Sequence, residues 1–230
     1  SIVTPRPQTT RHRILGLVNL PHAQIAFVDT PGLHHGARRA LNRAMNWTAA
    51  SALADADVVL FVVEAGRWTA DDQLALDRVI GGARPAIAVV NKMDRMRPRE
   101  AALPFIAELA ARHGFVDVVP CSARDTHNLD RLMECIGAQL PLSPPLFPPE
   151  QLTDRDTAFR IAEEIREKLT LELNQEVPYG IAVAIESMSE EDGRLAVSAV
   201  IWVDREGQKP IVIGEGGEEG AGVLLAGFEG

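Results

Sequence analysis

Short apolar runs alternate with longer amphipathic or alanine-rich segments through the first 140 residues of the chain. Apolar runs of this kind predict strands, and the segments between them predict helices. We expect strands at residues 14–20, 24–29, 57–64, 87–91 and 116–121, and helices at 37–54, 70–80, 98–113 and 128–140. Strands that alternate with helices form a mostly parallel sheet that is covered on both faces, so the pattern predicts an α/β fold.

Local signals define some of the boundaries. Pro21-His22-Ala23 has the length of a hairpin connection between the first two strands. Thr69 and Asp72 have the spacing of a capping box, which predicts a helix start at residue 70. Pro104 lies inside the segment at 98–113, where it predicts either a kink or a delayed helix start.

Five prolines in residues 141–149 predict a semi-rigid linker, because proline can neither continue a helix nor enter the interior of a sheet. We therefore expect one domain at 1–140, a linker at 141–152 and a second domain at 153–230. The second domain should open with a helix capped by Thr153 and Asp156. An apolar stripe supports that helix, and its members are Ala158, Ile161, Ile165, Leu169 and Leu173.

The remaining part of the second domain is predicted from weaker patterns. Residues 181–186 and 195–203 predict two strands. The basic residues of the predicted helix indicate a solvated face more readily than a nucleic-acid patch, and they are Arg155, Arg160, Arg166 and Lys168.

Composition limits the classes of function. The chain has 230 residues, 46% of them apolar, and no apolar stretch of the roughly 18 residues that a membrane span needs. No signal peptide is visible, and Cys121 and Cys135 fit a reducing cytoplasm better than a disulfide framework. The net charge of −9 argues against bulk nonspecific affinity for nucleic acid. A local basic patch that binds RNA is still compatible with this net charge.

The apolar run from Ile87 ends in Asn91-Lys92-x-Asp94, where a ligand would bind in an open α/β sheet. The Asp94 carboxylate can accept hydrogen bonds from the ring N–H and the exocyclic amine of guanine, and adenine offers no such donor pair. Asn91 can tie neighbouring loops together, and the Lys92 stem can cover the purine face. An ordinary polar turn in which aspartate is a cap explains these residues equally well when they are taken alone.

Asp29 ends the second predicted strand and is followed by Thr30-Pro31-Gly32. A carboxylate with a glycine three residues later suits a magnesium–phosphate site, because glycine lets the backbone approach a ligand. An ordinary Pro-Gly turn is the alternative. The neighbouring pair His34-His35 is better explained without a metal, since adjacent side chains rarely reach one ion and no third ligand is evident.

Ser122-Ala123 follows the strand at 116–121, and small residues there let backbone N–H groups reach a base carbonyl oxygen. The polar clusters at 29–32, 91–94 and 122–123 should all lie at one edge of the sheet, which favours a guanine-nucleotide site over three independent turns. Further along, Gly214-Glu215-Gly216-Gly217 follows an apolar segment. It has the form of the turn with which KH modules clamp a nucleic-acid backbone, or of a flexible glycine turn.

Several strings together resemble the Era family, whose members are GTPases with a C-terminal KH domain. They are Gln8-Thr9-Thr10-Arg11-His12-Arg13, Asp29-Thr30-Pro31-Gly32-Leu33-His34, Asn91-Lys92-x-Asp94, Ser122-Ala123, and Arg205-Glu206-Gly207-Gln208-Lys209 with Ile211-Val212-Ile213-Gly214. The resemblance implies a Ras-like, doubly wound P-loop GTPase sheet, followed by an α+β KH domain of type II.

The resemblance also implies a bacterial ribosome-assembly GTPase that binds GTP or GDP, the small ribosomal subunit and its RNA. It implies a cytoplasmic monomer with peripheral association at the inner membrane. Thr10 and Asp29 would hold Mg²⁺ and act with Gly32 in catalysis. The nucleotide would contact Asp29 to Leu33, Asn91, Lys92, Asp94, Ser122 and Ala123. RNA would contact Lys209, Gly214, Glu215, Gly216 and Gly217.

Leu33 occupies the position at which many GTPases place a water-orienting glutamine. The family has a hydrophobic residue there, and a leucine side chain can neither donate nor accept a hydrogen bond. Water must therefore be positioned by another group, and we expect slow unaided turnover.

Two features depart from the family pattern. The sequence contains no Gly-x-x-x-x-Gly-Lys-Ser/Thr, so we expect the phosphate loop and the first strand of the sheet to lie upstream of Ser1. Residues 210–230 contain four glutamates, seven glycines and no lysine or arginine, a composition that repels phosphate and forms helix poorly. We therefore expect an incomplete, inactive GTPase fragment, or alternatively an interaction scaffold that works without nucleotide.

Overall fold

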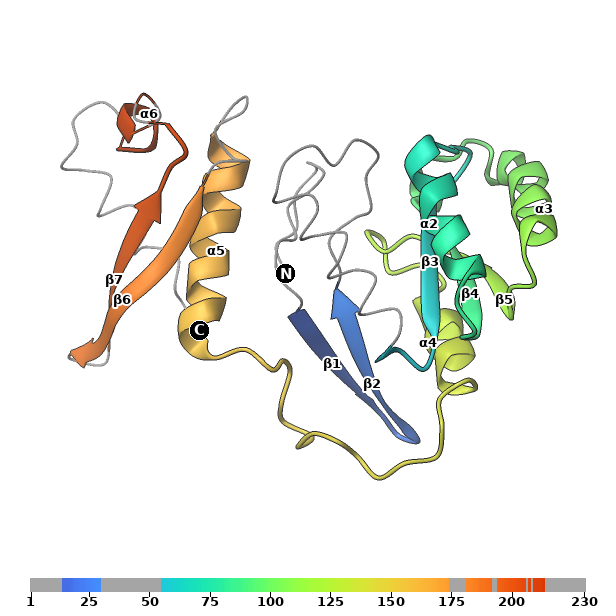
Figure 1. Cartoon of the computed structure of the whole chain (residues 1–230), viewed down its shortest axis with the longest axis horizontal. Coiled ribbons are helices and arrows are strands. Elements are labelled where there is room, and N and C mark those ends of the chain that lie inside the picture. Colours follow the sequence, from blue (N-terminus) through green and yellow to red (C-terminus); the bar gives the residue numbers. More distant parts are fainter. Residues whose placement is uncertain are drawn as a thin grey trace. The chain divides into compact units, whose positions relative to one another are not determined.

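The structure is a computed structural model, and it describes residues 14–29, 55–173, 181–191, 194–205, 207 and 209–213. Contacts divide the chain into two compact units (Figure 1). The first unit ends at Thr153, and the main part of the second unit begins at Asp154. The helix predicted at 37–54 lies outside the described residues.

A parallel sheet forms the centre of the first unit. Its strands are β3 (Val59–Glu64), β4 (Ala86–Asn91) and β5 (Asp117–Pro120), with β4 in the middle. The register pairs Glu64 with Asn91 and Val90 with Pro120, so the carboxyl ends of the three strands lie at one edge. The first five residues of β4 are buried, which is the pattern of a strand covered on both faces.

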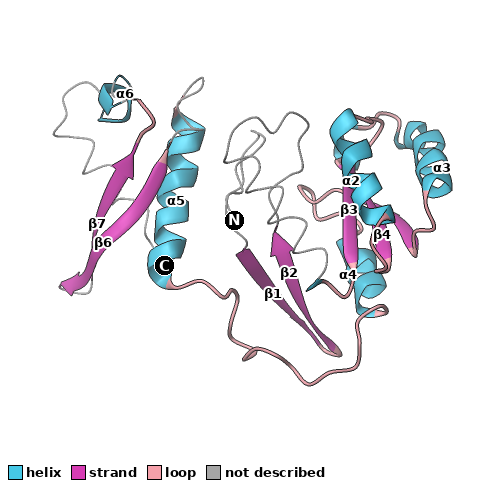
Figure 2. Cartoon of the chain, in the orientation of Figure 1, coloured by secondary structure: helices cyan, strands magenta, loops and turns pink. Residues whose placement is uncertain are grey.

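Helices cover both faces of this sheet (Figure 2). Residues of α2 (Ala70–Ile80) and α3 (Leu103–Arg112) pack on one face against Phe61, Ala88 and Val90. Residues of α4 (Leu129–Gly137) pack on the other face against Ile87, Val89 and Val119. This alternation confirms the predicted α/β class.

Two predicted helix boundaries are confirmed. The Thr69 side chain accepts a hydrogen bond from Asp72 N at 3.2 Å, and Thr69 N donates to Asp72 Oδ2 at 2.7 Å, which completes the capping box of α2. A short 3₁₀ turn, η2 (Arg99–Ala102), precedes α3, and Pro104 lies in the first turn of α3. The helix start is therefore delayed, as the proline predicts, because proline lacks the N–H that an interior position needs.

Strands β1 (Ile14–Leu20) and β2 (Ala23–Asp29) form the predicted antiparallel hairpin. They are not hydrogen-bonded into the parallel sheet. A cavity of about 410 Å³ lies beside the two sheets, and residues of β2, the segment 55–60 and α4 line it.

The proline-bearing linker segment is attached to this hairpin. Gln24 Oε1 accepts hydrogen bonds from Leu146 N at 2.8 Å and Phe147 N at 2.9 Å, and Gln24 Nε2 donates to Phe147 O at 2.9 Å. Leu17 N donates to Leu152 O at 2.9 Å. Residues 146–152 therefore belong to the first unit structurally rather than forming a free spacer.

The second unit places α5 (Thr157–Glu172) against the antiparallel pair β6 (Ala182–Glu191) and β7 (Arg194–Trp202). Ile161, Ile165 and Leu169 are buried in this contact, which confirms the predicted stripe. A short helix, α6 (Lys209–Ile213), follows. None of the helices in the described ranges combines the length and the apolar character that crossing a membrane requires.

Two expectations for the start of the second domain were wrong. The N-cap of α5 is Asp156, whose Oδ1 accepts from Phe159 N at 2.7 Å, whereas Thr153 forms a β-bridge with Gly16. Arg166 is not on a solvated face, because it is 4% exposed and its Nε lies 2.7 Å from Glu163 Oε1. The buried face of α5 is wider than the apolar stripe alone indicates.

Candidate functional site

The loop after β4 turns sharply because Lys92 adopts a left-handed backbone conformation, with φ 64° and ψ 33°. A 3₁₀ turn, η1 (Met93–Arg95), follows at once, and buried Met93 anchors it. Met93 N donates to Cys121 O at 3.1 Å, which ties this loop to the end of β5. Asp94 is thereby held at the carboxyl edge of the sheet, where sequence patterns predict it.

The Asn91 side chain joins two loops. Its Oδ1 accepts hydrogen bonds from Lys92 N at 2.7 Å and from Ala123 N at 3.0 Å. The second of these bonds links residues that are 32 positions apart in the sequence. Asn91 therefore has the loop-tying contact predicted for it, and Ala123 lies next to the Asn91-Lys92-x-Asp94 segment.

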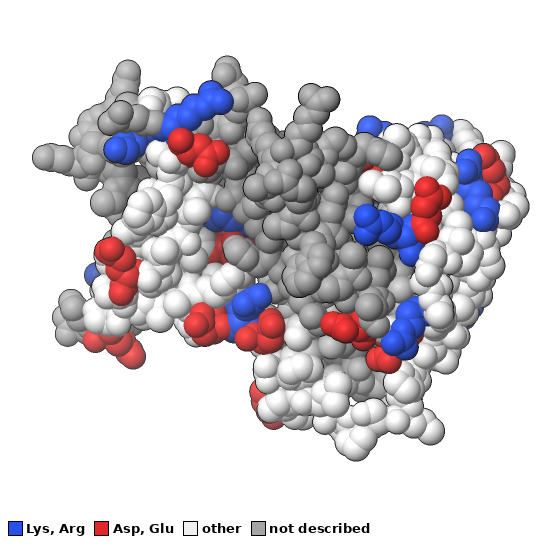
Figure 3. Space-filling view, in the orientation of Figure 1, with Lys and Arg blue, Asp and Glu red and all other residues white. Residues whose placement is uncertain are grey.

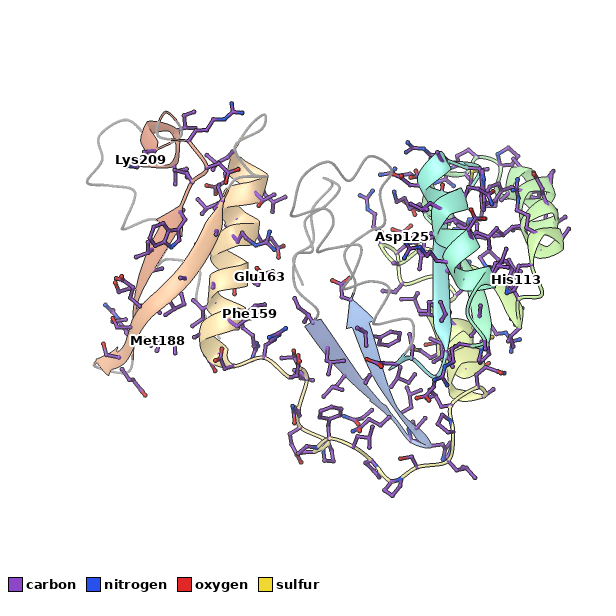
Figure 4. The ribbon with its side chains drawn as sticks, viewed as in Figure 1. His113, Asp125, Phe159, Glu163, Met188 and Lys209 are labelled. Atoms are coloured by element: carbon purple, nitrogen blue, oxygen red, sulfur yellow. The ribbon has the colours of Figure 1, made fainter. Side chains whose placement is uncertain are left out.

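Ser122 connects Asp94 to the loop after β5. Ser122 Oγ donates to Asp94 Oδ1 at 2.8 Å and accepts from Asp125 N at 3.2 Å. Ser122 itself is 1% exposed, and two backbone hydrogen bonds with His127 close its loop. Asp125 is labelled on this loop in Figure 4.

The hydrogen bond from Ser122 is the largest cause that holds the pKa of Asp94 below its ordinary value. A backbone hydrogen bond and the charges of Arg124 and Arg95 act in the same direction, whereas desolvation opposes them. Asp94 is therefore a carboxylate at neutral pH, and a carboxylate can only accept hydrogen bonds. It is suited to a ligand that presents N–H donors.

One expectation differs in detail from the structure. The sequence assigns the backbone N–H groups of Ser122 and Ala123 to a base carbonyl oxygen. In the structure, Ser122 N donates to His127 O at 3.1 Å and Ala123 N donates to Asn91 Oδ1 at 3.0 Å. A base carbonyl would have to share the Ala123 donor with Asn91, and this contact stays a prediction.

The sequence patterns missed Glu64, the last residue of β3. Glu64 Oε2 lies 2.7 Å from Lys92 Nζ, and Glu64 Oε1 lies 3.0 Å from Arg95 NH1. The hydrogen bond from Lys92 is the largest cause that lowers the pKa of Glu64, and Arg95 adds to it against desolvation. The signal that could have found Glu64 is the same as for Asn91: a polar residue that ends a buried parallel strand.

Several charged side chains of the described residues form local pairs. Figure 3 shows acidic and basic side chains adjacent to each other on the face in view. Glu64 pairs with Lys92 and Arg95, and Arg131 lies 2.9 Å from Asp117. Clusters of mixed sign hold side chains in place more than they attract a polyanion.

The predicted magnesium site is described in part. Asp29 ends β2, and its carboxylate is the hard oxygen ligand that Mg²⁺ prefers. Within the described ranges, no three His, Cys, Asp or Glu side chains are grouped as a metal site. Thr10, Thr30, Pro31, Gly32 and Leu33, together with His34 and His35, lie outside the described residues.

The predicted RNA contacts fall mostly outside the described ranges as well. Lys209 is exposed at the start of α6, where Figure 4 labels it. Gly214, Glu215, Gly216 and Gly217 follow α6 and are not described. The structure therefore brings together Asn91, Lys92, Asp94, Ser122 and Ala123, and Lys209 belongs to the other unit.

Comparison with family models gives two matches along the chain. Residues 1–92 match the family described as "50S ribosome-binding GTPase", and residues 176–219 match the KH domain family. The first match includes β4 and Lys92, and the second includes β6, β7 and α6. Both predicted domain types are thus recognised in the predicted order.

Curated relatives match across nearly the whole chain. The chain is 46% identical over 217 residues to the GTPase Era of Stenotrophomonas maltophilia strain R551-3, covering 94% of this chain and 73% of that protein. It is 45% identical over 218 residues to the GTPase Era of Marinobacter nauticus, covering 95% of this chain and 72% of that protein.

Two solved structures share the fold. Era in complex with MgGDPNP and nucleotides 1506–1542 of 16S ribosomal RNA aligns with a TM-score of 0.89 and 38% identity, covering 95% of this chain and 75% of that one. A variant of Aquifex aeolicus Era bound to GDP·AlF4⁻ aligns with a TM-score of 0.91 and 37% identity, covering 97% and 77%. The extent and identity of these matches mean that the chain belongs to the Era family of GTPases.

Proposed function

We propose that this protein binds guanine nucleotides with Mg²⁺, hydrolyses GTP, and binds 16S ribosomal RNA to assist assembly of the small ribosomal subunit. One observation carries the nucleotide part of the proposal. Asn91, Asp94, Ser122 and Ala123 form a connected hydrogen-bonded set at the carboxyl edge of the parallel sheet. Such a set is prepared before a ligand arrives, so little ordering is needed on binding.

Each member of the set has a proposed role in reading the base. Asp94 accepts hydrogen bonds from the guanine ring N–H and exocyclic amine. Ser122 holds the Asp94 carboxylate in its ionised form and in one orientation. Asn91 fixes the distance between the two loops, and the stem of Lys92 lies along the purine face.

The phosphate side of the site is proposed from the family motifs and from Asp29. Asp29 and Thr10 would hold Mg²⁺, which supplies charge neutralisation at the phosphates when it is bound. The Gly32 N–H would contact the terminal phosphate, beside Thr30 and Pro31. Leu33 cannot orient the attacking water through its side chain, so we expect slow turnover without an activating partner.

The RNA part of the proposal is supported by the KH-domain match at residues 176–219. It is also supported by the related Era structure that contains nucleotides 1506–1542 of 16S ribosomal RNA. Lys209 and Gly214 to Gly217 would contact the RNA backbone. We also propose that the protein works in the cytoplasm and associates peripherally with the inner membrane.

The test is a calorimetric titration with GDP and with ADP in the presence of Mg²⁺. It is made on the 230-residue chain and on the protein produced from its complete reading frame. We expect the latter to bind GDP over ADP by about 10³-fold or more, because a site built to hydrogen-bond a base leaves its polar groups unpaired with the wrong one. Equal affinities would overturn the proposal.

A single substitution tests the base reader. Asp94→Asn should shift the preference from GDP towards xanthosine diphosphate, because an amide can donate to the xanthine carbonyl that a carboxylate repels. An unchanged preference would remove Asp94 from its proposed role.

The 230 residues contain no Gly-x-x-x-x-Gly-Lys-Ser/Thr, and this observation favours a second candidate function. A scaffold that docks partners without nucleotide would bind neither GDP nor ADP in any form of the protein.

A further inference from the structure

Glu64 lies on the opposite side of β4 from the residues that hold Asp94. The sheet order is β3-β4-β5, with Glu64 at the end of β3 and Ser122 just after β5. Asp94 is tied to the β5 side through Ser122 at 2.8 Å. Lys92 is tied to the β3 side through Glu64 at 2.7 Å. The loop after β4 is therefore anchored on both flanks, by different residues.

The Glu64 carboxylate uses both oxygens. Oε2 accepts from Lys92 Nζ and Oε1 accepts from Arg95 NH1 at 3.0 Å, so two cations of the same loop are held by one anion. The Glu64 side chain is 24% exposed, whereas those of Lys92 and Arg95 are 44% and 63% exposed, so water screens these contacts in part. Arg67 NH1 lies farther away, at 3.9 Å from Oε2.

This ion pair restricts where the Lys92 stem lies. A lysine side chain has about 2 kcal/mol of rotamer entropy to lose, so an untethered stem samples many paths. In the structure, the left-handed turn fixes the Lys92 backbone, and Glu64 fixes the ammonium at the other end. The methylene groups between these two points therefore follow a restricted path at the carboxyl edge of the sheet, on its β3 side.

We propose that Glu64 is a positioning residue for the base site, which holds the Lys92 stem along the purine face and so slows nucleotide release. This inference rests on the proposed function, in which Lys92 covers the base. Methylene groups pack against any purine equally well, whereas Asp94 distinguishes guanine from adenine. Glu64 therefore affects how long a nucleotide stays bound and leaves the choice of base unchanged.

The experiment measures release of a fluorescent GDP analogue by stopped flow, with the protein from the complete reading frame and its Glu64→Gln variant. Loss of the Glu64 charge weakens its exposed contacts with Lys92 and Arg95 and should raise the release rate by about threefold to tenfold. The ratio of GDP to ADP affinity should stay the same. A changed ratio would show that Glu64 acts on base choice and would overturn the inference.

Two further variants separate positioning from general stability. Glu108→Gln removes the same kind of ion pair, at 2.6 Å to Arg112 on α3, and should leave the release rate unchanged. Lys92→Met keeps an apolar stem but removes the ammonium, so adding Glu64→Gln to it should have no further effect. If Glu64→Gln speeds release equally in the unsubstituted protein and in Lys92→Met, Glu64 does not act through Lys92 and the inference is wrong.

The two proposals fail in different ways. Absence of GDP binding to the unsubstituted protein would overturn the proposed function and this inference with it. Tight GDP binding with an unchanged release rate in Glu64→Gln would overturn this inference alone.

Discussion

The polar side chains buried in the described residues are Ser122, Arg166 and Thr170, and the two units use them differently. Ser122 of the first unit donates to Asp94, the proposed base reader. Arg166 and Thr170 of the second unit both lie in α5, and their hydrogen bonds there are made within the helix, to Glu163 and to the Arg166 carbonyl.

The comparison shows that a buried polar side chain has a different role in each unit. The partner of Ser122 is a carboxylate, whose two oxygens can accept several hydrogen bonds and so can also meet a ligand. Arg166 pairs with Glu163, which Figure 4 places on α5, and Thr170 donates to the Arg166 carbonyl, so these contacts join residues of one helix. Burial therefore prepares a site in the first unit and stabilises an element in the second. Three substitutions test this contrast.

The largest effect on stability is expected at Arg166. Arg166→Ala removes a buried ion pair whose side chains are 5% and 14% exposed, and we expect α5 to lose about 2–4 kcal/mol of stability. Hydrogen exchange of the α5 amides measures this loss locally. Lys168→Ala is the matched control on the same helix, because its 3.8 Å contact with Glu164 is exposed and should contribute less than about 0.5 kcal/mol. Equal effects of the two variants would contradict the contrast.

An intermediate effect is expected at Ser122, and it should appear in binding. Ser122→Ala removes a hydrogen bond to Asp94 and should weaken GDP binding by about threefold to tenfold. The same bond lowers the pKa of Asp94, so its removal raises that pKa towards the ordinary value. Recognition of guanine needs the Asp94 carboxylate. The carboxylate is present above the pKa of Asp94 and is lost as the pH falls through that pKa.

As the pH is lowered, GDP binding by Ser122→Ala should therefore decline before binding by the unsubstituted protein does. Both declines should occur below about pH 5. Titrations from neutral to acid pH measure this, with circular dichroism to confirm that both proteins stay folded. Identical acid profiles would show that Ser122 does not control the ionisation of Asp94.

The smallest effect is expected at Thr170. Its Oγ1 donates to the Arg166 carbonyl at 2.7 Å, within the same helix. Thr170→Val keeps the shape of the side chain and removes only this bond, so the cost should be about 1 kcal/mol or less. Chemical denaturation measures the cost, and GDP binding should not change. A loss of GDP affinity would show that the second unit's buried hydroxyl also serves the nucleotide site.

Much of the fold could be predicted from sequence where the determinant is local. The Thr69–Asp72 capping box, the delayed start of α3 at Pro104 and the hairpin at Pro21-His22 depend on a few neighbouring residues, and all agree with the structure. The juxtaposition of Asn91, Asp94, Ser122 and Ala123 was also predictable, because the carboxyl ends of parallel strands meet at one edge.

The errors occurred where the determinant is distant in sequence. Thr153 resembles a helix cap, but the edge of β1 lies beside it and Gly16 pairs with it instead. Arg166 resembles a solvated cation, but the α5 face that is covered in the fold extends beyond the apolar stripe. Glu64 was not predicted as a site residue because its partners, Lys92 and Arg95, follow β4, whereas Glu64 ends β3.

The left-handed backbone at Lys92 has a consequence for how this position responds to selection. Glycine adopts this conformation without steric conflict, whereas a residue with a Cβ atom costs about 1–2 kcal/mol there. Selection for thermal stability alone would therefore favour glycine at position 92, and selection for long nucleotide residence would favour lysine. Lysine at this position therefore carries a conformational cost that glycine would avoid, and its ion pair with Glu64 acts against that cost.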